Sequence, residues 1–587
     1  MRKHLFSRIM NALRGGGFLE KRCFLVYGKM YSACLYGIEG VMIGVEIDLA
    51  NGLPQTNIIG LPDSAVREAV ERVRAAVKNC GYSYPLQRVT INLAPADLRK
   101  EGSAFDLAIA LGILTTSSQL VMPDAGELLF IGELALDGSL RPVNGVLSMV
   151  EAARRAGLRA VLVPPGNAAE AALITGMKVY TAGHLSQLPE PVQLPASDAA
   201  ELSVTPHEEA IEQEELPFPV SAGNGAAGRN RPPVLVLSLE HLRYKPVVIT
   251  DNPPPLRAEH LMQEDYSDVL GQNHVKRALT IAAAGMHNIL LIGPPGTGKT
   301  MLIKRLPGIL PDLEDDEALE VTKIFSAAGM LRDGRQGLLR SRPFRSPHHT
   351  ISGAGLIGGG GIPKPGEVSL AHRGILFLDE LPEFSRAVLE VLRQPLEDGV
   401  VTISRARAAF TFPARFLLAG SMNPCMCGFL GSGGTQQRCT CSPARIARYR
   451  ARISGPLLDR MDMQVDVPRP KEWEAGAPQV SSAQMRTAVL RAQAIQSERY
   501  ERLPVSWNSE LSGAALRRYA ALRREEAMLL NSILESLGLS MRAHDRIIRL
   551  ARTIADLEGA EAINAAHLAE AVQYRNLDRQ VTADEEE

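Results

Sequence analysis

Residues 289–300 read Ile-Leu-Leu-Ile-Gly-Pro-Pro-Gly-Thr-Gly-Lys-Thr, and the apolar residues Met301-Leu-Ile follow directly. A short apolar strand therefore enters a glycine-rich loop, and the loop enters a helix. This matches G-x-x-x-x-G-K-[ST] in the context that phosphate binding requires, because the backbone N–H groups converge on phosphate oxygens at a helix N-terminus. A chance glycine loop is the alternative. The predicted nucleotide-binding residues are Gly293, Pro294, Pro295, Gly296, Thr297, Gly298, Lys299, Thr300 and Met301.

Two residues of the loop have distinct predicted roles. Lys299 would contact the β- and γ-phosphates, and Thr300 would coordinate Mg²⁺. ATP and Mg²⁺ are therefore the expected cofactors. The strand–loop–helix order predicts an α/β fold with a parallel sheet.

Polar side chains follow two further apolar strands. Ile375–Leu378 ends at Asp379 and Glu380, and the strand Phe416–Ala419 ends near Asn423. Ligands bind at the carboxyl ends of strands in open α/β sheets. Asp379 would hold Mg²⁺, Glu380 would orient and deprotonate the attacking water, and Asn423 would hydrogen-bond that water and the γ-phosphate. Two acids after a strand can also form a solvated loop, but the nearby glycine-rich loop favours ATP hydrolysis.

The composition of the whole chain excludes few functions. The 587 residues are too many for one hydrophobic core. With 64 Lys and Arg against 65 Asp and Glu, the net charge argues neither for nor against a nucleic-acid partner. No 18 uninterrupted apolar residues occur, so no membrane span is expected. Seven cysteines are too few for a disulfide scaffold, and a cytoplasmic location is expected.

The first part of the chain contains an extension and one domain. Residues 1–29 hold seven Lys or Arg and one acid, which predicts a disordered basic extension or a start codon assigned too early. Residues 30–190 mix strands and helices, as one α/β or α+β domain does. Within them, Val41–Ile47 alternates as a strand with one buried face, and Asp63 can cap the helix that follows.

The rest of the chain divides into three segments. Residues 191–257 are expected to be a mostly flexible linker, because the first 30 hold seven acids and no Lys or Arg. Residues 258–470 contain the nucleotide-binding motifs and form the predicted ATPase core. Residues 471–580 are rich in Ala, Leu, Arg and Glu, which predicts a helical domain.

Four cysteines lie close together in the sequence. Cys425 and Cys427 are separated by 11 residues from the second pair, Cys439 and Cys441. Two close pairs across a short loop can supply the four thiolates of a tetrahedral Zn²⁺ site. The C-x-C spacing is tighter than the usual C-x-x-C, and redox-active pairs or free thiols remain alternatives.

Several motifs beyond the phosphate loop point to one family. They include Gly271-Gln272, Arg345-Ser-Pro-His-His-Thr350, Asn92-Leu-Ala-Pro-Ala-Asp97 and Ala551-Arg-Thr-Ile-Ala-Asp-Leu557. Together they resemble the YifB/ComM family of magnesium-chelatase-like AAA+ ATPases from residue 30 to about residue 580. The resemblance implies a Lon-protease-like α+β N-terminal domain of the ribosomal-S5-like type, an AAA+ core and a helical C-terminal lid. It also implies a hexameric, ring-shaped, ATP-driven helicase that promotes branch migration of recombining DNA in natural transformation.

The same resemblance assigns further site residues. Asn423 resembles the sensor of AAA+ proteins. Arg542 resembles the lid arginine of the same subunit, and Arg460 resembles the finger arginine that a neighbouring subunit supplies. Arg452 is a rival for the finger, because it lies in an arginine-rich stretch, and each of these arginines could be a surface charge.

Two segments could contact single-stranded or branched DNA in the pore of a ring. One is the glycine-rich insert Ser352–Gly366. The other is a predicted hairpin, Val400–Ser404 with Phe410–Pro413, whose tip carries Arg405 and Arg407. Such contacts would be directed at phosphates, with little sequence preference, although a basic hairpin tip can be plain solvated surface.

Two other functions compete with the helicase. An ATP-dependent Lon-like protease would need a Ser–Lys dyad. The nearest serine, Ser103, lies in a departing motif, and the segment Arg141–Val150 that should carry the lysine has none. A serine without a base is a poor nucleophile. The other rival is a magnesium-chelatase motor subunit, but those subunits lack the Lon-like domain and the paired cysteines.

Overall fold

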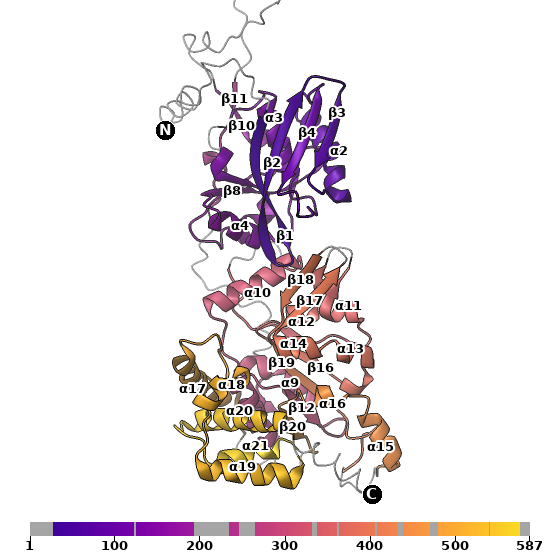
Figure 1. Ribbon diagram of the computed structural model, residues 1–587, viewed down its shortest axis with the longest axis vertical. Coiled ribbons are helices and arrows are strands. Elements are labelled where there is room, and N and C mark those ends of the chain that lie inside the picture. Colours follow the sequence, from indigo (N-terminus) through magenta and orange to yellow (C-terminus); the bar gives the residue numbers. More distant parts are fainter. Residues whose placement is uncertain are drawn as a thin grey trace, which may run out of the picture. The chain divides into compact units, whose positions relative to one another are not determined.

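The protein is described from a computed structural model, which divides into two compact units that meet in the sequence near residue 248 (Figure 1). The described residues are 27–122, 125–192, 234–245, 264–331, 337–360, 363–405, 408–431, 438–469, 479–538 and 540–575. Most of the predicted basic extension lies outside these residues. Its last three residues, 27–29, belong instead to the first strand.

A seven-stranded mixed sheet forms the centre of the first unit, in the order β3-β4-β2-β1-β5-β8-β9. These strands are β1 (Tyr27–Tyr36), β2 (Glu39–Ala50), β3 (Gln55–Ile59), β4 (Arg88–Ala94), β5 (Leu128–Phe130), β8 (Ala160–Val163) and β9 (Lys178–Thr181). The predicted alternation is confirmed in β2, where Ile43, Val45 and Ile47 are fully buried. Strand β2 pairs antiparallel with β1 and β4, whereas β5, β8 and β9 run parallel.

Helices complete the first unit and contribute to its core. They are α2 (Ser64–Asn79), α3 (Asp106–Thr116), α4 (Val146–Arg155) and α5 (Pro165–Ala171). The predicted cap of α2 is confirmed, because the Asp63 carboxylate accepts a hydrogen bond from the Val66 N–H at 2.8 Å. Helix α3 is apolar on all sides and almost entirely buried.

Part of the predicted linker belongs to the first unit. Strand β11 (Val234–Leu237) pairs antiparallel with β10 (Pro189–Val192), and the Val121 N–H donates to the Leu235 carbonyl at 2.9 Å. The prediction of a flexible linker is therefore wrong for residues 234–245. The acid-rich composition of the segment hid a short apolar strand that finds a partner more than 40 residues earlier. Residues 193–233 and 246–257 lie outside the described residues.

The second unit contains a five-stranded parallel sheet in the order β13-β16-β19-β12-β20. Its strands are β12 (Ile289–Ile292), β13 (Phe344–Arg345), β16 (Ile375–Leu378), β19 (Leu417–Met422) and β20 (Met463–Asp466). The central strands are buried on both faces, as parallel strands covered by helices are. The mixed α/β architecture with a parallel sheet confirms the predicted fold class. The Lon-like character of the first unit stays a prediction.

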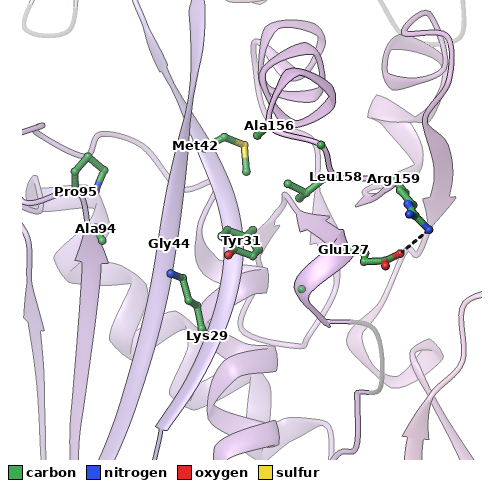
Figure 2. A pocket seen from close by; sticks show the side chains of 12 residues that line it. Lys29, Tyr31, Met42, Gly44, Ala94, Pro95, Glu127, Ala156, Leu158 and Arg159 are labelled. Carbon is green, nitrogen blue, oxygen red and sulfur yellow. Dashed lines mark ion pairs between the residues drawn. The ribbon is translucent and has the colours of Figure 1, made fainter. Parts of the chain in front are cut away.

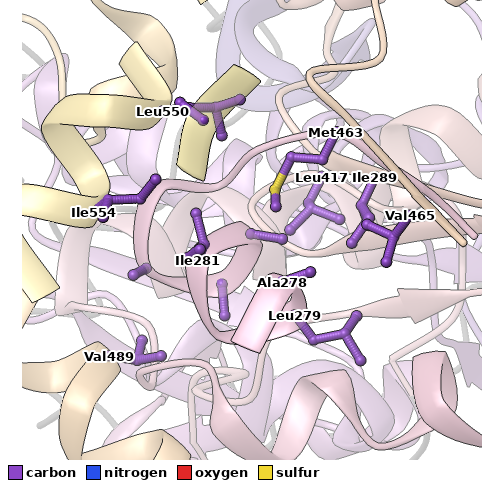
Figure 3. Packing of buried hydrophobic residues seen from close by; sticks show 14 of the residues in the cluster. Ala278, Leu279, Ile281, Ile289, Leu417, Met463, Val465, Val489, Leu550 and Ile554 are labelled. Atoms are coloured by element: carbon purple, nitrogen blue, oxygen red, sulfur yellow. The ribbon is translucent and has the colours of Figure 1, made fainter. Parts of the chain in front are cut away.

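Helices from the end of the chain pack against one side of this sheet. Around α8 (Asn273–Gly285) lie α17 (Ser482–Tyr500) and α20 (Met541–Glu558), as Figure 3 shows for Ile281, Val489 and Ile554. The remaining C-terminal helices are α18 (Gly513–Tyr519), α19 (Arg524–Leu537) and α21 (Ala565–Gln573). One continuous hydrophobic cluster contains residues of the sheet, of α8 and of these helices. The predicted helical C-terminal segment therefore shares its core with the sheet.

Candidate functional site

The glycine-rich loop connects β12 to α9 (Lys299–Lys304). Gly296 and Gly298 have φ angles of +79° and +84°, a region in which side chains are strained. The Thr297 hydroxyl donates to the Pro294 carbonyl at 3.0 Å, and the Gln272 side chain donates to the Thr297 carbonyl at 3.0 Å. These bonds hold the loop in its curved form, with a helix N-terminus directly behind it.

Lys299 lies where it can meet a phosphate. Its ammonium group donates to the carbonyls of Gly293 and Pro294 at 2.7 and 2.9 Å, and to the Asn423 side-chain oxygen at 3.3 Å. Burial lowers the pKa of this lysine, while the charges of Asp379 and Glu380 raise it. The structure thus brings Asn423, from the end of β19, to the loop that follows β12.

The two predicted magnesium ligands, Thr300 and Asp379, lie side by side. The Thr300 hydroxyl donates to the Asp379 carboxylate at 2.9 Å. The other carboxylate oxygen accepts from the Ser421 hydroxyl and from the Glu380 N–H, the latter at 3.1 Å. A hydroxyl and a carboxylate are the oxygen ligands that Mg²⁺ prefers, so these residues fit the ion.

Glu380 is exposed at the end of β16 and has a φ angle of +53°. Its N–H lies 3.3 Å from the Ser421 hydroxyl oxygen. A non-glycine residue in this left-handed region costs of the order of 1 kcal/mol and is typical of sites where a side chain must be aimed. Glu380 directly follows Asp379, and its role as the general base stays a prediction.

The two arginines expected at the γ-phosphate lie at the other end of the sheet. Asn288, which precedes β12, donates through its side chain to the Arg460 carbonyl and through its backbone to the Asp462 carboxylate, both at 3.0 Å. Arg460 therefore lies at the amino end of β12, whereas the glycine-rich loop begins at the carboxyl end. The Arg460 guanidinium is 8% exposed and pairs with Glu397.

Arg542 is exposed near the start of α20 and belongs to the same end of the sheet. One turn further along, the Arg546 guanidinium lies 3.6 Å from the Asp462 carboxylate, and Thr553 hydrogen-bonds His287 at 2.8 Å. Helix α20 thus packs against the amino ends of the strands. The helix that carries Arg542 therefore packs at the end of the sheet opposite the loop, and the role of Arg542 in the nucleotide site of its own subunit stays a prediction.

Arg452, the rival for the finger, has a different environment. It follows α15 (Pro443–Arg450) and pairs with Glu383 at 3.0 Å, with 46% of its side chain exposed. Glu383 ends the short 3₁₀ turn directly after Glu380. Arg452 also lines a hollow of about 490 Å³ together with Arg386 and Arg448. Arg452 is therefore the more accessible candidate, and both arginines would have to leave an ion pair to reach a neighbour.

The four clustered cysteines converge in space. Their sulfur atoms all lie within 4.8 Å of one another, and Cys425 is fully buried. The separations are 3.3 Å for Cys425–Cys427, 3.7 Å for Cys425–Cys439 and 3.6 Å for Cys427–Cys439. A hydrogen bond from the Phe429 backbone helps to lower the pKa of Cys427 to about 6, which favours a thiolate.

Sequence reasoning assigned no role to two residues of the site. Ser421, the donor to Asp379, is a buried hydroxyl inside an apolar strand, and that contrast was the available signal. Gln272 was read only as part of a motif, yet it is 4% exposed and joins the loop to the Pro468 carbonyl at 3.2 Å. Both contacts depend on strands and turns that are distant in the sequence.

Comparisons with known proteins cover most of the chain. Residues 265–475 match the model "Magnesium chelatase, subunit ChlI", residues 45–167 match "Subunit ChlI of Mg-chelatase", and residues 479–575 match "Magnesium chelatase, subunit ChlI C-terminal". The YifB protein of Escherichia coli K12 and the competence protein ComM of Haemophilus influenzae are each 41% identical over 553 residues, which is 94% of this chain and 97% of theirs. The chain belongs to the YifB/ComM family. The predicted resemblance is therefore confirmed, and membership of this magnesium-chelatase-like AAA+ group implies an ATPase motor.

A more distant relative matches part of this YifB/ComM protein. The magnesium-chelatase 38 kDa subunit of Cereibacter sphaeroides is 24% identical over 331 residues, which covers 52% of this chain and 88% of the relative. The chelatase subunit is thus similar to about half of the chain, whereas YifB and ComM are similar to nearly all of it.

The predicted hairpin of this family member is present. Strand β17 (Val400–Arg405) pairs antiparallel with β18 (Ala408–Pro413). The glycine-rich insert contains a short helix, α11 (Gly353–Ile357), and a second hairpin of β14 (Gly358–Gly359) with β15 (Lys364–Pro365). A Cβ atom at Gly358 would lie 3.2 Å from Ile403, so the two hairpins pack together. Arg407 lies outside the described residues.

In the part of the first unit that the structure describes, Ser103 pairs with an acid and not with a lysine. The Ser103 hydroxyl donates to the Glu133 carboxylate, which also lies 3.6 Å from Arg141. Lys100 is buried, and its ammonium group donates to the backbone carbonyls of Pro95 and Leu98. The ammonium is thus occupied by carbonyls, which supports the sequence argument against a dyad.

A shallow pocket of about 510 Å³ lies elsewhere in the first unit. Figure 2 shows Lys29 and Tyr31 on its wall and the ion pair between Glu127 and Arg159, whose closest N–O distance is 3.7 Å. No glycine-rich phosphate loop lines it.

Among the described residues, no helix is long and apolar enough to span a membrane.

Proposed function

We propose that this chain is the subunit of a ring-shaped ATPase that remodels branched DNA and promotes branch migration during recombination and natural transformation. The convergence of Lys299, Thr300, Asp379 and Asn423 supports the ATP-hydrolysing part. The printed name of the relative ComM, a competence protein, supports the DNA part. The reaction would take place in the cytoplasm, where a competent cell recombines incoming DNA.

In this proposal the chain's own residues divide the work of hydrolysis. The loop N–H groups and Lys299 bind the phosphates, and Thr300 and Asp379 hold Mg²⁺, which supplies charge neutralisation when bound. Glu380 accepts a proton from the attacking water, and Asn423 orients that water. A general base of this kind contributes about 10²- to 10⁴-fold to the rate.

A neighbouring subunit would supply the remaining positive charge. Arg460 and Arg542 lie at the end of the sheet away from their own glycine-rich loop, so neither can reach its own nucleotide without large movement. A homo-oligomer, here a hexamer, places that end of one subunit beside the loop of the next. Arg460 is the proposed finger, and the exposed Arg452 is the rival.

The paired hairpins are the proposed DNA-contacting surface. The β17–β18 and β14–β15 hairpins pack on each other. Contact with single-stranded or branched DNA there would be directed at phosphates and would weaken with salt.

We also propose that the cysteine cluster holds a structural Zn²⁺ ion, because four converging thiols are a tetrahedral donor set.

A magnesium-chelatase motor subunit is the second candidate. The family models and the Cereibacter sphaeroides relative favour it. The extent of the match favours the first candidate, since the chelatase relative covers only 52% of this chain. A peptidase is disfavoured by the absence of a lysine beside Ser103 that is free to act as a base.

The deciding experiment is an ATPase assay with and without a four-way DNA junction. The proposal expects the junction to stimulate hydrolysis and the purified protein to move the branch point. Lys299→Ala is the control, because this variant should still bind DNA but should not hydrolyse ATP. Hydrolysis that ignores DNA but responds to a chelatase partner would favour the second candidate, and ATP-dependent digestion of casein would favour the peptidase.

A further inference from the structure

The distances within the cysteine cluster match one metal ion. Four sulfurs at about 2.3 Å from Zn²⁺ in a tetrahedron lie about 3.8 Å apart. The measured sulfur separations of 3.3, 3.7 and 3.6 Å are close to that value. The cluster is therefore preorganised for tetrathiolate coordination, with Cys425 fully buried and the other three partly exposed.

The cluster touches the nucleotide site on one side. Cys425 comes two residues after Asn423, whose side chain accepts from Lys299. A Cβ atom at Gly428 would lie 2.7 Å from the Pro295 side chain, so the backbone after Cys427 packs directly against the glycine-rich loop. The cysteine segment thus continues the strand that carries Asn423 and lies against the phosphate loop.

On its other side the cluster adjoins α15. Cys441 directly precedes Ser442, the N-cap of that helix. Near the end of the helix, the buried Tyr449 hydroxyl hydrogen-bonds the backbone of Asn423. Arg452, just beyond the helix, pairs with Glu383 close to Glu380. Helix α15 therefore connects the metal ligands to both predicted water-handling residues.

We infer that a Zn²⁺ ion held by the four cysteines positions Asn423 and α15, so that metal occupancy controls ATP hydrolysis rather than ATP binding. The inference rests on the ATP hydrolysis in the proposed function. The cysteines act here as positioning residues, because they would hold the ion while Lys299 and the loop N–H groups hold the phosphates. Removing the ion would free the Asn423 segment while leaving Lys299 and the loop N–H groups intact.

The first test measures metal content and steady-state kinetics of the full chain. One Zn²⁺ per chain is expected, and Cys427→Ser with Cys439→Ser should abolish it, whereas Cys80→Ser, a partly exposed cysteine of the first unit, should not. Removing the metal should lower kcat by about 10-fold or more with the KM for ATP changed little, and added Zn²⁺ should restore it. Cys439→His, which keeps four ligands, should retain both metal and activity.

The second test separates this inference from the proposed function. Co²⁺ replaces Zn²⁺ and reports its thiolate environment by visible absorption. Because Asn423 contacts Lys299 and lies two residues from Cys425, saturating Mg-ATP should change that spectrum in the unmutated protein and much less in Asn423→Ala.

Less than about one Zn²⁺ per five chains, an unchanged kcat after metal removal, or an unchanged Co²⁺ spectrum would each overturn the inference. A protein that shows the spectral change but no DNA stimulation would retain the inference and lose the DNA part of the proposed function. A spectral change without any ATP hydrolysis would retain the link between the two sites and lose the proposed control of catalysis.

Discussion

The two ends of the parallel sheet differ in how their charged groups are satisfied. At the carboxyl end, Lys299 has three oxygen acceptors and Asp379 has three hydrogen-bond donors, all within one chain. At the amino end, among the described residues, Arg460, Arg546 and Arg549 each keep a buried guanidinium nitrogen without a hydrogen-bond partner.

Positive charge is in excess at the amino end. Burial alone would raise the pKa of Asp462, yet His287, whose Nδ1 lies 3.7 Å from the carboxylate, and the charge of Arg546 hold that pKa below its usual range. The carboxylates of Asp462 and Glu397 each face more than one arginine, and guanidinium donors remain without a partner. Under the proposed function, the carboxyl end would bind ATP with residues of one chain, whereas the amino end would meet the nucleotide of a neighbouring subunit.

The largest effect is expected when an arginine is removed from the amino end of the sheet. Arg460→Ala is expected to lower ATP hydrolysis by about 10³-fold or more while ATP binding and ring formation persist, because a finger arginine stabilises the transition state of a neighbour. Rates, nucleotide affinity and particle mass would be measured on the same preparation.

Mixing distinguishes this role from a structural one. Arg460→Ala combined with Lys299→Ala should regain part of the activity, since some mixed interfaces pair an intact loop with an intact arginine. Arg452→Ala and Arg542→Ala are the matched variants. Full activity of Arg460→Ala alone would transfer the role to one of them, and full activity of clear monomers would remove the need for any neighbour.

A change at the carboxyl end should act within its own subunit. Glu380→Gln is expected to lower hydrolysis by about 10²- to 10⁴-fold without weakening ATP binding, because the water loses its base while Lys299, Thr300 and Asp379 remain. Nucleotide binding and hydrolysis would be measured side by side. Mixing with Lys299→Ala should give no recovery, and unchanged hydrolysis would exclude Glu380 as the base.

A smaller effect is expected from the support of the magnesium ligand. Ser421→Ala removes a hydrogen-bond donor to Asp379 and should weaken the apparent affinity for Mg²⁺ by about 10-fold. A metal ligand that loses its hydrogen-bond partner binds the ion less well. The activity should recover at high Mg²⁺ concentration. Ser421→Thr, which keeps the hydroxyl, is the control, and equal Mg²⁺ titrations for all three proteins would contradict the assignment.

The smallest effect is expected from Gln272, which hydrogen-bonds the Thr297 carbonyl of the glycine-rich loop. Gln272→Ala leaves the Thr297 and Pro468 carbonyls without this donor, which costs about 1–3 kcal/mol of stability. The melting temperature and ATP affinity should both fall modestly, with kcat nearly unchanged. The exposed neighbour His274, changed to alanine, is the control. A drop in kcat alone would place Gln272 in catalysis.

Much of the site could be predicted from short segments of sequence. The loop from Gly293 to Thr300 is contiguous, so its glycines and lysine reveal phosphate binding directly. Asp379 and Asn423 could be placed beside it because parallel strands end at one edge of a sheet. The four cysteines were predicted as one cluster since their spacing brings them close along the chain.

Other features depended on contacts between distant segments. Nothing local shows that Ser421 faces Asp379, because that depends on the register between β16 and β19. Within the predicted helical segment, the break between α18 and α19 also appears only in the structure. Composition also hid β11 within the predicted linker, because its partner strand lies far away in the sequence.

Sequence alone was enough to predict the phosphate loop, the acids at the strand ends and the parallel α/β core, because each is encoded by residues that are neighbours along the chain. The position of Arg460 and Arg542 at one end of the sheet could be known only from the tertiary structure, since it depends on how the helices pack around α8. It also decided that the cysteine cluster lies against Pro295 and Asn423. Burial and strand register are properties of the assembled fold, so no local pattern can specify them.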